Sequence, residues 1–219
     1  MPRALTAAVL IFAAMTLLPA CSAGRSVSYK FWESFGYEKR DLFVDQVQDA
    51  RAEQAETKDE FQSALDQFKA TFGFDGGDLE AAYDSLKGSY DGIEEQADDL
   101  RDEVEKVKTI AGDLFDEWEG EIELQNNPDY QRAMQQQFDA TQRSYNDMIA
   151  AMDRAVSKMD PVLQDFNDRV LFLKSSLNAK AIAALQTNAD ELIGDIDALI
   201  AEMNASIAEA DAFLAELEG

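Results

Sequence analysis

The chain has 219 residues, of which 46% are hydrophobic, and 19 Lys and Arg against 44 Asp and Glu give a formal net charge of −25. So apolar a chain is typical of a folded protein, and its acidity excludes nucleic-acid binding by phosphate neutralisation, which needs clustered basic residues. The absence of His from the sequence excludes His-based acid–base catalysis, Ser-His and Cys-His dyads and imidazole metal ligands. We therefore expect a protein that is not an enzyme, and we assign no catalytic and no cofactor-binding residue.

Residues 1–20 are typical of a secretory signal peptide. A positive charge at Arg3 precedes an apolar region from Leu5 to Leu18, and a small residue, Ala20, ends the segment. This is the order that a signal peptide requires. A transmembrane helix is the alternative, but an uncharged run of about 17 residues that contains Pro19 is marginal for crossing a bilayer.

Cys21 is the only cysteine in the sequence, and it directly follows Leu18-Pro19-Ala20. This tetrapeptide resembles a bacterial lipobox, in which the cysteine is acylated and the signal peptide is cut before it. A buried structural thiol is the alternative. Because several acyl chains on one residue give stable membrane anchoring, we predict that Cys21 is a lipid attachment site. In a Gram-negative host, Ser22 in place of Asp favours the outer membrane, facing the periplasm.

Residues 21–40 are predicted to form a membrane-proximal tether. From residue 22 to residue 40 the chain has four basic and two acidic residues, and five aromatic residues, Tyr29, Phe31, Trp32, Phe35 and Tyr37. Aromatic rings and Lys are favoured at membrane interfaces, so the tether can lie on the membrane surface. The alternative is a first helical turn that packs on the rest of the protein.

Residues 41–219 contain four stretches in which apolar residues recur at alternating steps of four and three. This spacing places them on one helix face and is typical of a coiled-coil seam. The four seams run from Phe43 to Phe68, from Leu79 to Trp118, from Met134 to Phe166 and from Ile182 to Leu217. In the last stretch a second apolar row, Ile193, Ile200, Ile207 and Leu214, predicts a broader buried face.

Turn residues separate the seams. Gly73–Asp78 supplies glycines and an N-cap at Asp78. Asn126-Asn127-Pro128 supplies an Asn that ends one helix and a Pro at the start of the next. The third turn is predicted at Ser175–Asn178, with Pro161 as an alternative break. We therefore predict an all-α fold of long antiparallel coiled-coil helices, a four-helix up-down-up-down bundle. The alternative is a helical hairpin followed by one extended, kinked helix.

Several segments of the mature chain together resemble one bacterial family. They are Arg40–Val44, Gln48–Arg51, Gly73–Glu80, Leu114–Glu119, Met159–Leu163, Val170–Lys174 and Leu177–Ile182. The family they resemble is DUF2959, which is named only as a domain of unknown function. The resemblance implies a helical envelope protein, and it implies no activity, cofactor or catalytic residue.

Two charged clusters are candidate sites. The first is acidic: Asp113, Asp116, Glu117, Glu119, Glu121 and Glu123. Carboxylates suit Ca²⁺ or Mg²⁺, but helical residues two apart point about 200° from each other, so we expect a solvated face and assign no metal ligand. The second is basic: Arg169, Lys174 and Lys180, with the apolar run Val170–Leu173. It is either a partner-binding elbow or, as we expect, a fully buried helix crossing whose basic residues offset nearby acids.

Two functions are compatible with these features. We expect a non-enzymatic periplasmic lipoprotein, a structural or adaptor module that is held at the membrane by its lipid and docks an envelope protein through its helices. The alternative is a carboxylate-rich binder of divalent cations or of a small ligand in envelope stress. The sequence leaves the identity of the partner and the oligomeric state open.

Overall fold

The computed structural model describes residues 36–73, 79–176 and 178–218, and within these ranges the regular structure is helical. The helices are α2 (Gly36–Thr71), α3 (Leu79–Leu124), α4 (Pro128–Ser175), α5 (Ala179–Thr187) and α6 (Ala189–Glu218). The predicted all-α fold is therefore confirmed. The signal peptide, Cys21 and the tether up to residue 35 lie outside the described residues.

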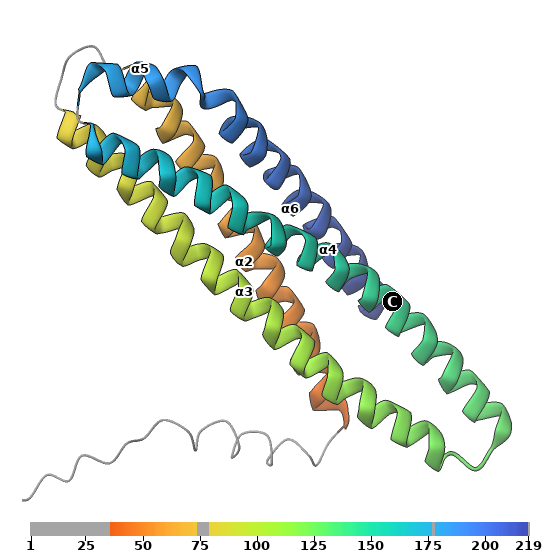
Figure 1. Cartoon of the computed structure of the whole chain (residues 1–219). Coiled ribbons are helices and arrows are strands. Elements are labelled where there is room, and N and C mark those ends of the chain that lie inside the picture. The colour runs from red at the N-terminus through yellow and green to blue at the C-terminus, as the bar shows by residue number, and fades with distance from the viewer. Residues whose placement is uncertain (1–35, 74–78, 177, 219) are drawn as a thin grey trace, which may run out of the picture. The chain divides into compact units, whose positions relative to one another are not determined.

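Four arms run side by side: α2, α3, α4 and a fourth arm made of α5 and α6 (Figure 1). Ion pairs between neighbouring arms join Lys39 to Glu117, Lys108 to Asp153, Arg154 to Glu202 and Arg51 to Asp211. As the residue number rises in one arm, the number of its partner falls in the next: Arg101 pairs with Asp160 and Lys108 with Asp153, and Ser144 bonds to Glu216 and Arg154 to Glu202. Neighbouring arms are therefore antiparallel. The pair from α2 to α6 closes the ring of arms. The up-down-up-down bundle is confirmed, and the alternative of a hairpin with one extended helix is wrong.

The four predicted seams form the core. In α2 every seam position from Phe43 to Phe68 is buried, and in α3 the same holds from Ile93 to Trp118. The α6 seam is buried from Leu192 to Phe213, while Ile193, Ile200 and Leu214 of the second row are partly buried and pack against the core. Burial of one apolar face by each arm supplies the main stabilisation of the fold.

Rings from all four arms meet in one layer of the core. The Phe43 ring centroid lies 6.5 Å from that of Phe115, 6.0 Å from that of Tyr145 and 5.7 Å from that of Phe213. The contacts of Phe43 with Phe115 and Phe213 are edge-to-face, which aromatic quadrupoles favour. We call these four residues the aromatic layer.

Two predicted helix starts are confirmed by their caps. The Asn127 side chain accepts a hydrogen bond from the Asp129 amide at 2.9 Å, and Pro128 is the first residue of α4. The Asn178 side chain accepts hydrogen bonds from two backbone amides of α5, at 3.0 and 3.2 Å. Such bonds satisfy amides that have no partner within the helix. Helix α4 continues through Pro161, and Asp78 lies outside the described residues.

The prediction of a single fourth helix is wrong, because the fourth arm breaks at Asn188. The Asn188 amide donates to the Leu185 carbonyl at 3.2 Å, and its side chain donates to the Ala184 carbonyl at 3.1 Å. Asn188 thereby caps the end of α5. The apolar spacing continues across the break, since Leu185, Ala189 and Leu192 are all buried. The hydrophobic pattern therefore does not reveal the break.

Candidate docking surface at the elbow

We call the end of α4 from Asp168 to Ser175, together with α5 and Asn188, the elbow. Four large hydrophobic side chains of the described residues are exposed: Leu124 by 80%, Tyr130 by 64%, Leu171 by 50% and Phe172 by 41%. Leu171 and Phe172 lie next to each other near the end of α4. Isolated exposed hydrophobic residues are common on protein surfaces, but adjacent ones beside a hollow mark interaction sites.

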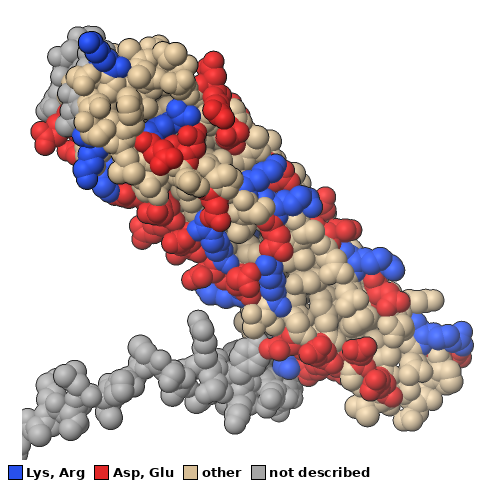
Figure 2. Space-filling view, in the orientation of Figure 1, with Lys and Arg blue, Asp and Glu red and all other residues tan. Residues whose placement is uncertain are grey.

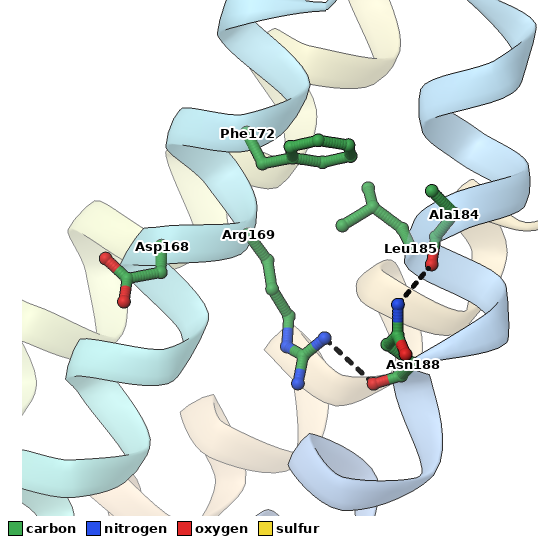
Figure 3. A pocket seen from close by; sticks show the side chains of 6 residues that line it. All are labelled: Asp168, Arg169, Phe172, Ala184, Leu185 and Asn188. Atoms are coloured by element: carbon green, nitrogen blue, oxygen red, sulfur yellow. Dashed lines mark hydrogen bonds between the residues drawn. The ribbon is translucent and has the colours of Figure 1, made fainter.

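A hollow of about 210 Å³ lies beside Phe172, between α4 and α5. Its lining residues are Asp168, Arg169, Phe172, Ala184, Leu185 and Asn188. Figure 3 shows the Phe172 ring and the Leu185 side chain facing each other across it, while Asp168 points away. The hollow therefore has an apolar wall contributed by both helices.

Leu171 and Phe172 are exposed because consecutive residues of a helix point about 100° apart. In α4 the core-facing positions are Val170, 3% exposed, and Leu173, fully buried, so the two residues between them point outward. The expected fully buried helix crossing is therefore wrong for Leu171 and Phe172. The neighbouring arms cover them only in part, so two of the four residues of this apolar run are exposed.

Arg169 links the break in the fourth arm to α4. Its Nη1 donates to the Asn188 carbonyl oxygen at 2.8 Å, and its Nη2 and Nε donate to Asp165 Oδ2 at 2.8 and 3.2 Å (Figure 3 shows the first of these bonds). Its side chain is only 10% exposed. The expectation that basic residues here offset nearby acids is confirmed for Arg169. Arg169 is a positioning residue that fixes one wall of the hollow.

The remaining basic residues of the elbow face solvent. Lys174 lies in the last turn of α4 and Lys180 in the first turn of α5, and both are exposed. The elbow has three basic residues and one acidic residue, Asp168, in a chain whose net charge is −25. The exposed apolar pair is therefore bordered by local positive charge.

The acidic cluster of the sequence analysis does not converge on one point. Glu117 forms an ion pair with Lys39 at 2.7 Å, whereas Glu119, Glu121 and Glu123 are exposed. Among the described residues, no three potential metal ligands gather closely enough to hold an ion. Acidic side chains are instead spread along the face of the bundle that Figure 2 shows.

The carboxyl group of Glu53, between α2 and α3, lies where its charged form is disfavoured. Partial burial, together with the neighbouring carboxylates Glu56 and Asp99, raises the pKa of Glu53 above its ordinary value. The Gln96 amide donates a hydrogen bond to Glu53 and opposes this shift. The opposite case lies between α4 and α6, where Lys158 and Arg154 lower the pKa of Glu202.

A second cavity, of about 360 Å³, lies where α2 begins and α6 ends. Arg40, Phe43 and Trp118 are among its lining residues. The Arg40 guanidinium stacks over the Trp118 ring at 4.9 Å from its centroid, and the preceding Lys39 pairs with Glu117. The last two residues of the predicted tether thus pack on α3, in agreement with the alternative of a helical turn packed on the rest of the protein.

These features define the class of protein: an all-α antiparallel bundle of four arms with an apolar, basic elbow on its surface. The chain belongs to the DUF2959 family, whose description is "protein of unknown function" and whose family model matches residues 28–217. The resemblance drawn from the sequence is confirmed. Searches of curated proteins and of solved structures gave no match. No helix of the described residues has an apolar stretch long enough to cross a bilayer.

The sequence did not lead us to predict that Leu185 and Asn188 line a surface hollow. A local signal for the break was present, since Gln186-Thr187-Asn188-Ala189-Asp190 combines a capping Asn with an acid at the next helix start. The sequence did carry a signal for the exposure of Leu171 and Phe172. The seam spacing, continued beyond Phe166 by four and three residues, reaches Val170 and Leu173, the two buried residues of this apolar run, and leaves Leu171 and Phe172 off the seam.

Proposed function

We propose that the protein is a non-enzymatic structural or adaptor module, anchored to the cell envelope through a lipid on Cys21, that docks a partner protein at the elbow. The observation that carries this proposal is the adjacent exposure of Leu171 and Phe172 beside a hollow with an apolar wall. Apolar and aromatic anchors of this kind, seated in pockets and surrounded by polar residues, dominate the energetics of protein interfaces.

The size of the hollow favours a protein partner over a small molecule. Its volume of about 210 Å³ is below the roughly 300–1,000 Å³ of ordinary ligand sites. Its polar groups are also engaged within the protein, since Arg169 bonds to Asp165 and Asn188 while the Asn188 side chain bonds to Ala184. A single apolar side chain of a partner is the occupant that this hollow fits.

The docking proposal is tested by site-specific photo-crosslinking in cells. A photoreactive residue at position 172 of the intact lipoprotein should give covalent products with protein, identified by mass spectrometry. The matched control is position 164, an exposed Gln on the same helix, which should give none. If positions 171 and 172 both yield no product, the elbow is not a docking surface.

The anchoring proposal has a separate test. Cys21 is the only cysteine in the sequence and follows a lipobox-like Leu-Pro-Ala. Metabolic labelling with a fatty acid should therefore disappear in Cys21→Ala, and this variant should leave the membrane fraction. Labelling that persists in the variant would reject lipidation at Cys21. Fractionation of the wild-type membranes tests the outer membrane, facing the periplasm, as its location.

The alternative of a divalent-cation binder remains a prediction with its own measurement. If the acids form only a solvated face, NaCl and CaCl₂ matched for ionic strength should stabilise the bundle similarly, by screening repulsion. A specific site should instead give saturable stabilisation by Ca²⁺, of more than about 2 kcal/mol near a hundredfold excess over the dissociation constant. The second result would favour cation binding over docking.

A further inference from the structure

We propose that the elbow of one copy of this chain binds the α3–α4 tip of a second copy. The tip is residues 119–139, which comprise the end of α3, the connection and the first turns of α4. This inference rests on the proposed docking at the elbow and names its partner. It would create a head-to-tail assembly, because the two surfaces that meet are different.

The exposed large hydrophobic side chains of the described residues form two pairs, one in the tip and one in the elbow. Leu124 is the last residue of α3 and Tyr130 the third of α4, so the tip presents both beside one short connection. Leu171 and Phe172 lie near the other end of α4. Figure 1 shows that the two ends of α4 lie at opposite ends of this long helix. At 1.5 Å per residue the continuous helix α4 separates the two pairs by roughly 60 Å, so tip and elbow of one copy do not meet.

The two surfaces carry opposite charge. From residue 119 to residue 139 the sequence has five acidic residues and one basic residue, Arg132, which forms an ion pair with Asp129. Glu119, Glu121 and Glu123 are all exposed. The elbow has three basic residues and one acidic residue, Asp168, so its net charge is +2, and Lys174 and Lys180 are exposed. Charge complementarity of this kind guides partner choice and suppresses wrong pairings.

The same charges disfavour symmetric association. Two elbows facing each other would bring Lys174 and Lys180 of both copies together, and two tips would bring their glutamates together. Like charges brought together across an interface oppose binding. A tip on an elbow instead pairs acid with base and places Leu124 or Tyr130 against the wall of Phe172 and Leu185. Of the three pairings, only this one satisfies both the charge and the apolar surface.

The first test maps where position 172 crosslinks. The full-length lipoprotein, with a photoreactive residue at position 172, is crosslinked in cells that also express isotopically heavy or epitope-tagged wild-type protein. We expect a dimer in which residue 172 of one copy is joined to a peptide containing residues 124–130 of the other. A dimer joined elbow to elbow would overturn the head-to-tail arrangement. Products with a different protein only would overturn self-association and keep the proposed docking, whereas no product would overturn both.

The second test reverses charge at each surface. Lys174→Glu with Lys180→Glu should lower the dimer yield about tenfold or more, and Glu121→Lys with Glu123→Lys should do the same. Coexpression of the two variants should restore crosslinking between them, because the reversed elbow then meets the reversed tip. The control reverses Lys106 and Lys158, both half-exposed in the middle of the bundle, and should leave the yield unchanged. Loss of dimer in all three variants, or failure of the coexpressed pair to crosslink, would overturn the proposal.

Discussion

Large apolar side chains are buried in the aromatic layer and exposed at the elbow. In the aromatic layer Phe43 is 1% exposed and lies against rings from the other three arms. At the elbow Leu171 and Phe172 belong to an equally apolar run, yet they are 50% and 41% exposed. The side chains of the two regions are similarly hydrophobic. The regions differ in how much of each side chain other parts of the protein cover.

The comparison shows that burial depends on which face of its helix a residue occupies and on what lies beside that face. Each of the four arms supplies one ring to the aromatic layer, so the core is enclosed from all sides there. At the elbow Leu171 and Phe172 lie on the outward face of α4, between the core-facing Val170 and Leu173, and are only partly covered. A surface that has this composition but only partial intramolecular cover is what docking requires.

The largest contrast is expected between two leucines of α3. Leu100→Asp would place a charge at a fully buried position between the two regions, at a cost of several kcal/mol, which is enough to unfold a marginally stable bundle. Leu124→Asp makes the same change at an 80% exposed position and should be nearly neutral. Circular dichroism and the melting midpoint check both variants. Equal melting midpoints would reject the enclosed core.

A direct test of the comparison truncates one ring in each region. Phe43→Ala should destabilise the protein by about 3–5 kcal/mol, because it leaves a cavity between three other rings. Phe172→Ala should change stability by less than about 1 kcal/mol, because much of this ring already faces water. Urea unfolding measures both. If Phe172→Ala costs as much as Phe43→Ala, the elbow belongs to the core.

A smaller effect is expected from the link between the elbow and α4. Arg169→Ala removes three hydrogen bonds and leaves the Asn188 carbonyl without this donor, at a cost of about 1–3 kcal/mol. Hydrogen exchange should then increase in α5 before it increases in α6. Lys174→Ala, which removes an exposed cation from the same helix, is the control and should leave exchange in α5 unchanged.

The smallest effect comes from the raised pKa of Glu53. A carboxyl group with a raised folded-state pKa loses stabilisation as the pH rises above its ordinary value of 4.5, because the charged form is disfavoured in the folded protein. Glu53→Gln should therefore stabilise the protein at pH 7, by less than about 1 kcal/mol, and this gain should disappear at acidic pH.

A matched substitution at Glu202 should act in the opposite direction. Its pKa is lowered by Lys158 and Arg154, so its charged form is favoured in the folded protein, and Glu202→Gln should destabilise at pH 7. Urea unfolding at neutral and acidic pH measures both variants. The same sign of change at pH 7 in both would contradict the assigned electrostatic environments.

Local features of the sequence predicted most of the helices and the core. The seams in α2, α3, α4 and α6 follow from a spacing that depends only on helical geometry, and the caps at Asn127 and Asn178 depend on residues two or three positions away. The break at Asn188 was missed because the apolar spacing, which guided the prediction, continues through it.

By itself, the sequence determined which residues of each helix face inward, because a period of about 3.6 residues places them on one side wherever that helix packs. Only the tertiary structure decided which arms are neighbours, since contacts such as Arg51 with Asp211 join residues 160 positions apart. Only the tertiary structure also decided that Phe172, which lies off the seam, stays exposed, whereas Ile193 and Ile200, which also lie off the seam, pack against the core. Burial depends on the surface that other parts of the chain bring alongside a residue, and no local pattern contains that information.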